Sequence, residues 1–544
     1  MMLLVFMLLI GMAGQSPQAA QPWKVMTLDL AGADGANNNT AFVEDRYIMV
    51  APYAPSKMPT DAAAVEPLDN CNIFLVDSKK PSDNVQAHVI GSAVDPKMRL
   101  YYPTRLMYDE RTHIAYVRGT RYEPVEGGVK EIAVIAYMHV NLDTYGKPTF
   151  DDNVVMIDIA GVGEETVADA PDDFLLAYNG ELLVFTNGAS VFTFNINHGY
   201  LYQVDLVKAE AYDAGGRIAY LGLDDATHTL SVYWNSQAVE KGAAKNATEL
   251  SFYALDQNGT MRLNKRLYPE DFADGAYLTG GSSIEIFQSK DADGVLHTSG
   301  LFVTSDGSLS QVDATSPDHS IKRLVQFDAM ATSGADGSPR ILKLDTAKRT
   351  VGVVRQGYTA QIRKPANGRG GKPGSVIRAL SLFEPVEPPA LAVARFNKPL
   401  NKVVGSKVFA DDFRGEDGLT RLIDGQESQW MLATRSGKVI ALSTADAMDT
   451  LALSVLTQLG SRTGRIDYSA SRDSIVAINS YGLDGAQEQI AESGELIVAR
   501  RTSGGAQTFS IASASTASAS VAAGDRGSQS PTPSIRRPCN INKK

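Results

Sequence analysis

An acidic stretch, SKDADG at 289–294, is the part of this chain that comes nearest to a calcium loop. Hard cations such as Ca²⁺ prefer several carboxylate oxygens within one tight turn, and Asp291 and Asp293 stand two positions apart. An EF-hand would need an Asp at Ser289 and a Glu at Gly300, and neither is present. We therefore predict a hairpin turn here, with solvated Asp291 and Asp293.

Seven histidines are the other candidate metal ligands and acid-base groups. They show no metal-ligand spacing, so each taken alone is expected to have a structural role. A composite His/Asp site stays open only if the fold brings distant residues together. We name no catalytic residue and predict no metal site and no cofactor. The seven are His88, His113, His139, His198, His228, His297 and His319.

Sequence motifs of the common hydrolases and nucleotide-binding proteins are missing. There is no G-x-S-x-G elbow and no H-E-x-x-H pair. The glycine-rich stretch ANGRGGKP differs from a phosphate-binding loop, because Ala366 replaces the first glycine and Pro373 replaces the Ser or Thr. We expect the wider segment 363–375 to be a loop between two strands.

Charge and cysteine content narrow the class of protein. Among 544 residues, 51 Lys and Arg face 62 Asp and Glu, and this net charge of -11 disfavours nucleic acid as a partner. A hydrophobic content of 44% is ordinary for a globular protein. Two cysteines, Cys71 and Cys539, cannot form a disulfide framework. Unpaired thiols are expected, with a bond between the two as the alternative.

Both ends of the chain differ from its middle. The apolar run at 1–12 is shorter than the roughly 20 helical residues that cross a bilayer, so residues 1–22 are interpreted as a signal peptide with a linker. An uncleaved anchor, which would be the chain's one link to a membrane, and a buried strand are the alternatives. Residues 506–544 form a Ser/Ala-rich tail that is expected to be disordered. Export would place the protein in a secreted, periplasmic or cell-surface location, where sequons at Asn38, Asn246 and Asn258 could matter.

Hairpin signals fill the region between these ends. The stretch WMLATRSGKVIALS, at 430–443, is an apolar run, a Ser-Gly pause and a second apolar run. Two further stretches, at 181–196 and 300–314, repeat it around Asn187-Gly188 and Asp306-Gly307. Such dipeptides favour type I′ turns, in which both central residues take positive φ.

Looser copies of the hairpin occur throughout the chain, and one of them would pair 349–357 with 375–383. The segment 444–460 fits either a helix or another strand. The tyrosine-containing stretches 200–204 and 231–234 are expected to pack between sheets. Equivalent positions in eight hairpins are Tyr47, Ile114, Leu182, Leu230, Phe302, Val351, Met431 and Ile475.

This repetition predicts an all-β fold, a β-propeller of seven or eight four-stranded blades over residues 23–505. A strand at 23–32 precedes the first clear blade, and we expect it to close the ring as the outer edge of the last blade.

The stretches at 430–443 and 300–314 resemble the repeats of quinoprotein-like (PQQ-type) and WD40/YVTN-like β-propellers. Only Trp23, Trp234 and Trp430 are present, and they do not recur in register, so the quinone cofactor of the first group is not expected. Because a fold does not define a function, the resemblance implies architecture alone.

We expect a monomeric module that binds or scaffolds a protein, peptide or glycan partner rather than an enzyme. The alternative is a lactonase-like propeller hydrolase or lyase, with a composite metal or carboxylate site at the ring axis.

Overall fold

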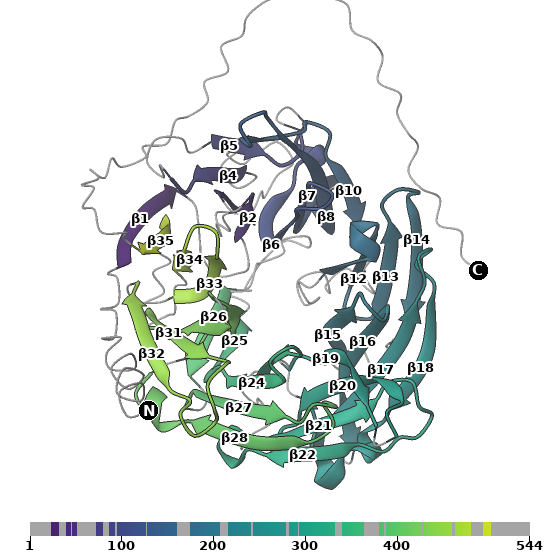
Figure 1. Cartoon of the computed structure of the whole chain (residues 1–544). Helices are drawn as coiled ribbons and strands as arrows, with labels where there is room; N and C mark the ends of the chain where they lie inside the picture. Colours follow the sequence, from purple (N-terminus) through teal and green to yellow (C-terminus); the bar gives the residue numbers. More distant parts are fainter. Residues whose placement is uncertain are drawn as a thin grey trace, which may run out of the picture.

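The computed structural model shows a closed ring of β-sheets (Figure 1). Within its described ranges, no helix combines the length and the apolar character that a membrane span requires. The structure describes residues 23–31, 40–44, 46–51, 72–79, 86–92, 95–126, 128–159, 174–206, 216–240, 243–278, 282–291, 293–331, 340–363, 380–385, 388–416, 418–426, 428–459, 463–479 and 493–501.

Eight four-stranded sheets, numbered here as blades 1 to 8, make up the ring, which confirms the predicted fold class and fixes the blade number. Blade 1 is β2 (Thr40–Val43), β3 (Tyr47–Val50), β4 (Asn72–Asp77) and β5 (Gln86–Val89). Blade 2 is β6 (Tyr101–Asp109), β7 (Ile114–Val125), β8 (Gly128–Leu142) and β10 (Val155–Asp158), with β9 (Pro148–Phe150) also on β8. Blade 3 is β11 (Phe174–Ala177), β12 (Leu182–Thr186), β13 (Ser190–Asn195) and β14 (Tyr200–Asp205). Blade 4 is β15 (Arg217–Asp224), β16 (Thr229–Glu240), β17 (Ala243–Leu255) and β18 (Met261–Leu267).

The second half of the chain repeats this plan and adds one separate hairpin. Blade 5 is β19 (Glu285–Lys290), β20 (Leu296–Val303), β21 (Ser308–Asp313) and β22 (Lys322–Gln326). Blade 6 is β23 (Arg340–Asp345), β24 (Thr350–Arg355), β27 (Ala390–Phe396) and β28 (Val403–Phe409), and β25 (Tyr358–Arg363) pairs with β26 (Leu380–Pro385) outside it. Blade 7 is β29 (Ile423–Asp424), β30 (Gln429–Ala433), β31 (Lys438–Ser443) and β32 (Leu453–Gln458). Blade 8 is β33 (Thr463–Ser469), β34 (Ser474–Asn479), β35 (Ser493–Arg501) and β1 (Trp23–Ala31).

The eight positions chosen as equivalent in the sequence fall one to a blade, each on its second strand. The stretches at 430–443, 181–196 and 300–314 form the pairs β30–β31, β12–β13 and β20–β21, as predicted. Local alternation and a Gly turn therefore marked the middle hairpin of blades 3, 5 and 7. The first strands lie innermost, where β2 packs against β6 and β33, and β15 against β19 (Figure 1).

Ring closure follows the prediction for the N-terminal strand. β1 is the outermost strand of blade 8 and pairs antiparallel with β35, from Trp23 opposite Arg501 to Ala31 opposite Ser493. The last blade thus combines one strand from the start of the described chain with three from its end. The predicted boundaries at 22 and 505 are adjacent to or among residues outside the described ranges, so they stay predictions.

The hydrophobic core lies between blades. Each of eight buried clusters joins two neighbouring blades, such as Tyr116 of blade 2 with Phe185 of blade 3. Between blades 6 and 7, Trp430 is 1% exposed and packs over Gly352, where a Cβ would lie 2.5 Å from Leu422 Cδ1 and 2.8 Å from Trp430 Cζ3. Neither blade could bury this surface alone, so neighbouring blades stabilise one another.

The hairpin turns differ from the predicted type I′ geometry. Gly188, Gly307 and Gly437 have positive φ of 90°, 85° and 90°, but Asn187 and Asp306 do not share it. At 304–308, Gly307 N–H donates to the Thr304 carbonyl at 2.9 Å and Thr304 N–H donates to the Ser308 carbonyl at 3.0 Å. This is a three-residue loop, in which only the glycine must adopt the left-handed region.

Two other expectations are corrected, and the choice left open at 444–460 is resolved. β24 pairs with β27, not with the segment 375–383, because β26 at the end of that segment pairs with β25 in a separate hairpin. The segment 444–460 contains strand β32 and no helix. Tyr200 and Tyr202 are 61% and 41% exposed on β14, because the outermost strand of a blade has no second sheet close against it. In contrast, Tyr233 is buried between blades 4 and 5 as expected.

Candidate functional site

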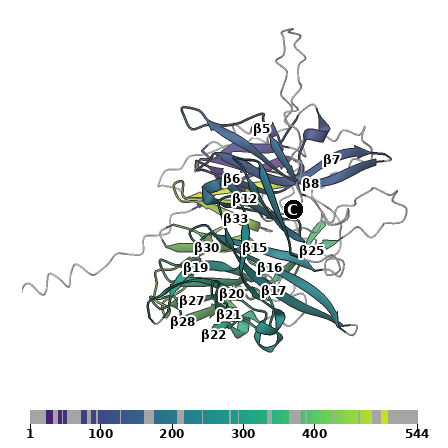
Figure 2. The same cartoon turned by 90° about the vertical axis from the view of Figure 1, so that its right-hand side faces the viewer.

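The two ends of the ring are built differently. Strands alternate in direction within each blade, so the turns between first and second and between third and fourth strands share one end, here called the turn end. The connections between second and third strands and between blades share the other end, here called the hairpin end. The turn end is closed by short loops, whereas the hairpin end carries the long excursions (Figure 2).

Three long hairpins rise from the hairpin end, on blades 2, 4 and 6. β7 pairs with β8 out to Val125 and Gly128, and β16 pairs with β17 out to Glu240 and Ala243. On blade 6, the separate hairpin of β25 and β26 lies between β24 and β27 in the chain. In the side view, the strands of all three extend toward the same side of the ring (Figure 2).

The base of the β7–β8 hairpin is fixed by side chains. Arg121 donates from Nε and Nη2 to the two carboxylate oxygens of Asp158 at 2.7 and 2.6 Å, a two-pronged contact that restricts both side chains. Tyr122 is 7% exposed and lies edge-on to Tyr101, with ring centroids 5.3 Å apart. The hairpin therefore starts from an ordered base on blade 2 and can present its exposed tip in a defined direction.

Charged residues from four successive inner strands interact near the ring axis. Lys343 Nζ on β23 lies 3.0 Å from Asp424 Oδ2 on β29. Glu285, half-buried on β19, has its pKa raised to about 7 by burial, an effect that Lys343 opposes and that Asp224 and Asp424 reinforce. A carboxyl group that titrates near neutrality can hold or release a proton at physiological pH.

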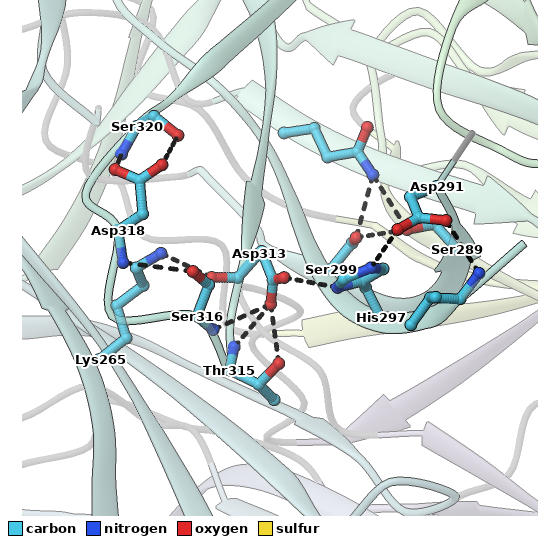
Figure 3. Close-up of polar contacts among 12 residues, drawn as sticks. Lys265, Ser289, Asp291, His297, Ser299, Asp313, Thr315, Ser316, Asp318 and Ser320 are labelled. Atoms are coloured by element: carbon cyan, nitrogen blue, oxygen red, sulfur yellow. Dashed lines mark hydrogen bonds and ion pairs between the residues drawn. The ribbon is translucent and has the colours of Figure 1, made fainter. Parts of the chain in front are cut away.

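A histidine between two aspartates occupies the turn end of blade 5 (Figure 3). His297 Nδ1 lies 2.7 Å from Asp313 Oδ2, and His297 Nε2 lies 3.1 Å from Asp291 Oδ2. Hydrogen bonds to Asp291 and then to Asp313 raise the pKa of His297. When the ring is protonated, each nitrogen donates to a carboxylate, so neither can act as a base or bind a metal in that state.

This arrangement revises the interpretation of 289–294. The predicted hairpin turn is present, but Asp291 is not simply solvated, since it also accepts hydrogen bonds from the backbone N–H groups of Asp293 and Val295 at 2.9 and 2.8 Å. Lys265 of blade 4 donates from Nζ to the Asp313 carbonyl at 2.6 Å, which adds a tie between neighbouring blades. The hydrogen bonds of His297 and Lys265 therefore connect the two turns of blade 5 and tie them to blade 4.

A cluster of three buried polar side chains lies beside His297. Ser289 and Ser299 hydroxyls are 2.6 Å apart, and Gln311 Nε2 donates to Ser299 Oγ at 2.9 Å and to Ser289 Oγ at 3.3 Å (Figure 3). The hydroxyls face one another and Gln311, not His297, so no serine is activated as a nucleophile by this ring.

The remaining histidines contact different partners. His228 stacks on Tyr178 with centroids 4.1 Å apart, and His113 Nδ1 is 2.8 Å from the Tyr108 hydroxyl. His88, His139, His198 and His319 lie on or beside β5, β8, β13 and β22. Over the described ranges, no three His, Cys, Asp or Glu side chains are placed to hold a metal ion.

Several sequence candidates lie outside the described residues: Cys71, Cys539, Asn38, the apolar N-terminal run, the tail at 506–544 and the glycine-rich stretch between Ala366 and Pro373. Asn258 is exposed in the turn between β17 and β18, and Asn246 is part of β17. The axial group of Glu285, Lys343 and Asp424 had no sequence signal, because its members belong to three blades and to no shared motif.

Solved structures share the architecture at low identity. BamB from Moraxella catarrhalis is 12% identical with a TM-score of 0.40, over 88% of this chain and 99% of that chain. The RRP9 WD40 repeats are 11% identical with a TM-score of 0.34, over 89% and 99%. A chain of the Mitotic Checkpoint Complex is 9% identical with a TM-score of 0.36, over 90% and 95%. At such identities and scores, these likenesses carry no argument about function.

No family model and no curated protein matches the sequence. The expected resemblance to β-propeller repeat proteins of the PQQ-type and WD40-like kind is confirmed at the level of the fold, by the eight-bladed ring itself.

Proposed function

We propose that this protein is a binding or scaffolding module that holds a protein or peptide partner against the hairpin end of the ring. The observation that carries the proposal is the set of three long hairpins on blades 2, 4 and 6, which extend toward one side of the ring (Figure 2). Binding residues concentrate on loops and hairpins that a rigid scaffold positions, and the interlocked blades supply such a scaffold.

Photo-crosslinking in the cells that make the protein tests this proposal. A crosslinking residue replaces Glu123 or Lys130, which are exposed on the β7–β8 hairpin, and in a matched control it replaces Tyr145, which is 86% exposed at the turn end. The hairpin positions should yield the same protein adduct, and the control should not. Adducts from Tyr145 alone, or none from either hairpin position, would refute a partner at the hairpin end.

A shortened hairpin gives a second measure with the partner so identified. Replacing 123–130 by Asn-Gly keeps the Arg121–Asp158 contact and removes the tip. We expect at least a tenfold increase in the dissociation constant of the purified partner. Unchanged affinity would exclude this hairpin from the binding surface.

A second candidate function rests on one observation, the half-buried Glu285 beside Lys343 and Asp424. A carboxyl group with a pKa of about 7 suits a general acid in a lactonase-like hydrolase. Glu285→Gln should then abolish hydrolysis of a lactone panel while Glu270→Gln, at an exposed glutamate, leaves it intact. Wild-type protein that hydrolyses none of the panel would remove support for this candidate.

We also propose that the protein is exported, to a secreted, periplasmic or cell-surface location, on the basis of the apolar run at 1–12 and the small residues Gly11, Ala13, Ala19 and Ala20. N-terminal sequencing of the mature protein should find cleavage within 11–22. An intact N-terminus on protein found in the cytoplasmic fraction would contradict export.

A further inference from the structure

Three hydrogen-bond donors are buried without a partner at the turn end, where blade 8 meets blade 1. They are Arg472 Nε, Arg500 Nη2 and Ser78 Oγ, and none of them bonds to any residue that the structure describes. Buried donors are nearly always satisfied, and an orphaned N–H on a charged guanidinium is especially costly. Three such groups around one interface indicate a bonding partner that is not among the described residues.

Ser78 and Arg500 face the interface between blades 8 and 1. Val76 of blade 1 packs in one cluster with Val476 and Val498 of blade 8. Because alternate residues of a strand point to the same side, Ser78 continues the face of Val76, and Arg500 continues the face of Val498.

Arg472 is tied to this place by its own backbone. Ser474 and Arg500 are cross-strand partners, and Arg500 Nε donates to Ser474 Oγ at 3.2 Å. The Ser474 hydroxyl in turn donates to the Arg472 carbonyl at 3.0 Å. The backbone of Arg472 thus lies beside Arg500, and the Arg472 guanidinium is near enough to lower the pKa of Arg500.

Asp77 and Asp473, the described carboxylates that adjoin Ser78 and Arg472 in the chain, pair with other arginines. Asp77 binds Arg46 through two hydrogen bonds of 3.2 and 2.7 Å. Asp473 lies 3.2 Å from Arg501 Nε and accepts a hydrogen bond from the Tyr468 hydroxyl at 2.9 Å.

Burial and then the neighbouring Arg472 lower the pKa of Arg500, and Asp77 opposes them only in part. A water molecule could satisfy the donors, but it would leave two like charges side by side. An anion would satisfy the donors and also balance the two positive charges.

We propose that Arg472, Arg500 and Ser78 form a binding site for an oxyanion, a phosphate or carboxylate group, at the seam between blades 8 and 1. Guanidinium groups present paired N–H donors that fit the oxygens of these anions, and a serine hydroxyl adds a third donor from the opposite blade. One anion would then join the blade that contains both ends of the described chain to its neighbour. This site does not depend on the function proposed for the hairpin end.

Equilibrium dialysis and thermal unfolding of the full chain with inorganic phosphate test the site, at constant ionic strength set by chloride. We expect saturable binding of one phosphate per chain and a midpoint temperature that rises with phosphate concentration. Arg472→Gln and Arg500→Gln should each weaken phosphate binding at least tenfold, and Ser78→Ala should weaken it less.

Arg501→Gln is the matched control, because Arg501 is the next residue on the same strand but pairs with Asp473 on the other side. This variant should bind phosphate as the wild type does. Acetate in a parallel series shows whether a carboxylate suffices, and we expect a response weaker than that to phosphate.

Relief of like charge gives an additional signature. In phosphate-free buffer, Arg472→Gln should unfold at a temperature no lower than that of the wild type, although it no longer responds to phosphate. Wild-type protein without saturable phosphate binding, or a phosphate response that Arg472→Gln and Arg500→Gln both retain, would overturn the site.

Discussion

The turn end and the hairpin end of the ring differ in construction, although the same strands form both. At the turn end, short loops are capped by side chains, as where Asp109 accepts hydrogen bonds from Arg111 and Thr112, and several of these contacts reach the next blade. At the hairpin end, pairs of strands continue beyond the outer strands of their sheets, and Glu123 and Lys130 on the β7–β8 hairpin are exposed. On the function proposed above, stability and recognition would be separated along the ring axis, so changes at the two ends should have different consequences.

The largest stability effect is expected at a turn-end cap. Asp109 is 8% exposed, and its carboxylate accepts hydrogen bonds from Arg111 Nε at 3.2 Å and from Thr112 Oγ1 at 2.8 Å. Asp109→Ala leaves these donors without their acceptor and should lower the free energy of unfolding by about 2 kcal/mol. Urea denaturation measures it. Asp293→Ala, at an exposed turn aspartate, is the control and should stay within about 0.5 kcal/mol.

The next effect lies between the two ends, at Glu285. Its carboxyl ionises near pH 7 in the folded protein but near 4.5 when unfolded, so the folded state retains a proton in this window and stability falls as pH rises through it. Glu285→Gln cannot ionise, so it should be more stable than the wild type at pH 8, by on the order of 1 kcal/mol after solvent screening, and about equal at pH 4. Urea denaturation at both pH values measures it. An advantage that is the same at both would exclude ionisation as the cause.

A smaller, pH-dependent effect is expected at the turn end of blade 5. Asp291 and Asp313 raise the pKa of His297, so its contribution to stability is complete below about 6.5, the unfolded pKa, and is lost as pH rises through the folded value. His297→Gln should therefore lower the thermal midpoint more at pH 5.5 than at pH 9. The effect stays modest because solvent screens a side chain that is 30% exposed. A larger deficit at pH 9 would contradict this assignment.

The smallest effect is expected at the hairpin end. Replacing 123–130 by Asn-Gly removes the tip of the β7–β8 hairpin but keeps Tyr122 against Tyr101. The free energy of unfolding should change by less than about 1 kcal/mol, because exposed hairpin tips bury little apolar surface. A loss as large as that of Asp109→Ala would show that the hairpin tip also stabilises the fold.

The blades were predictable because their signals are local. A Gly turn between alternating runs, as at Gly437 and Gly307, marks the middle hairpin of a blade within about 15 residues of sequence. The strand at Trp23 could be placed because a closed ring needs a partner for its last sheet.

What the sequence could not show depends on distances in space. Glu285 and Asp424 are on different blades, and only the curvature of the ring brings them into one electrostatic group. The hairpin of β25 and β26 has the same alternation as a blade strand, so the pattern could not reveal that it lies outside the sheet. Tyr200 shows the same limit, because β-strand alternation does not distinguish an outer strand from an inner one.

The pairing of β1 with β35 sets the order of events during synthesis. The ribosome synthesises Trp23 long before Arg501. Strand β1 therefore lacks its partner β35 while the other seven blades can already form. Contacts between such remote parts of a chain form slowly, and an unpaired strand edge can form hydrogen bonds with other chains and aggregate. Ring closure is therefore a late folding step. A chaperone that covers the unpaired strand edge would act before this step.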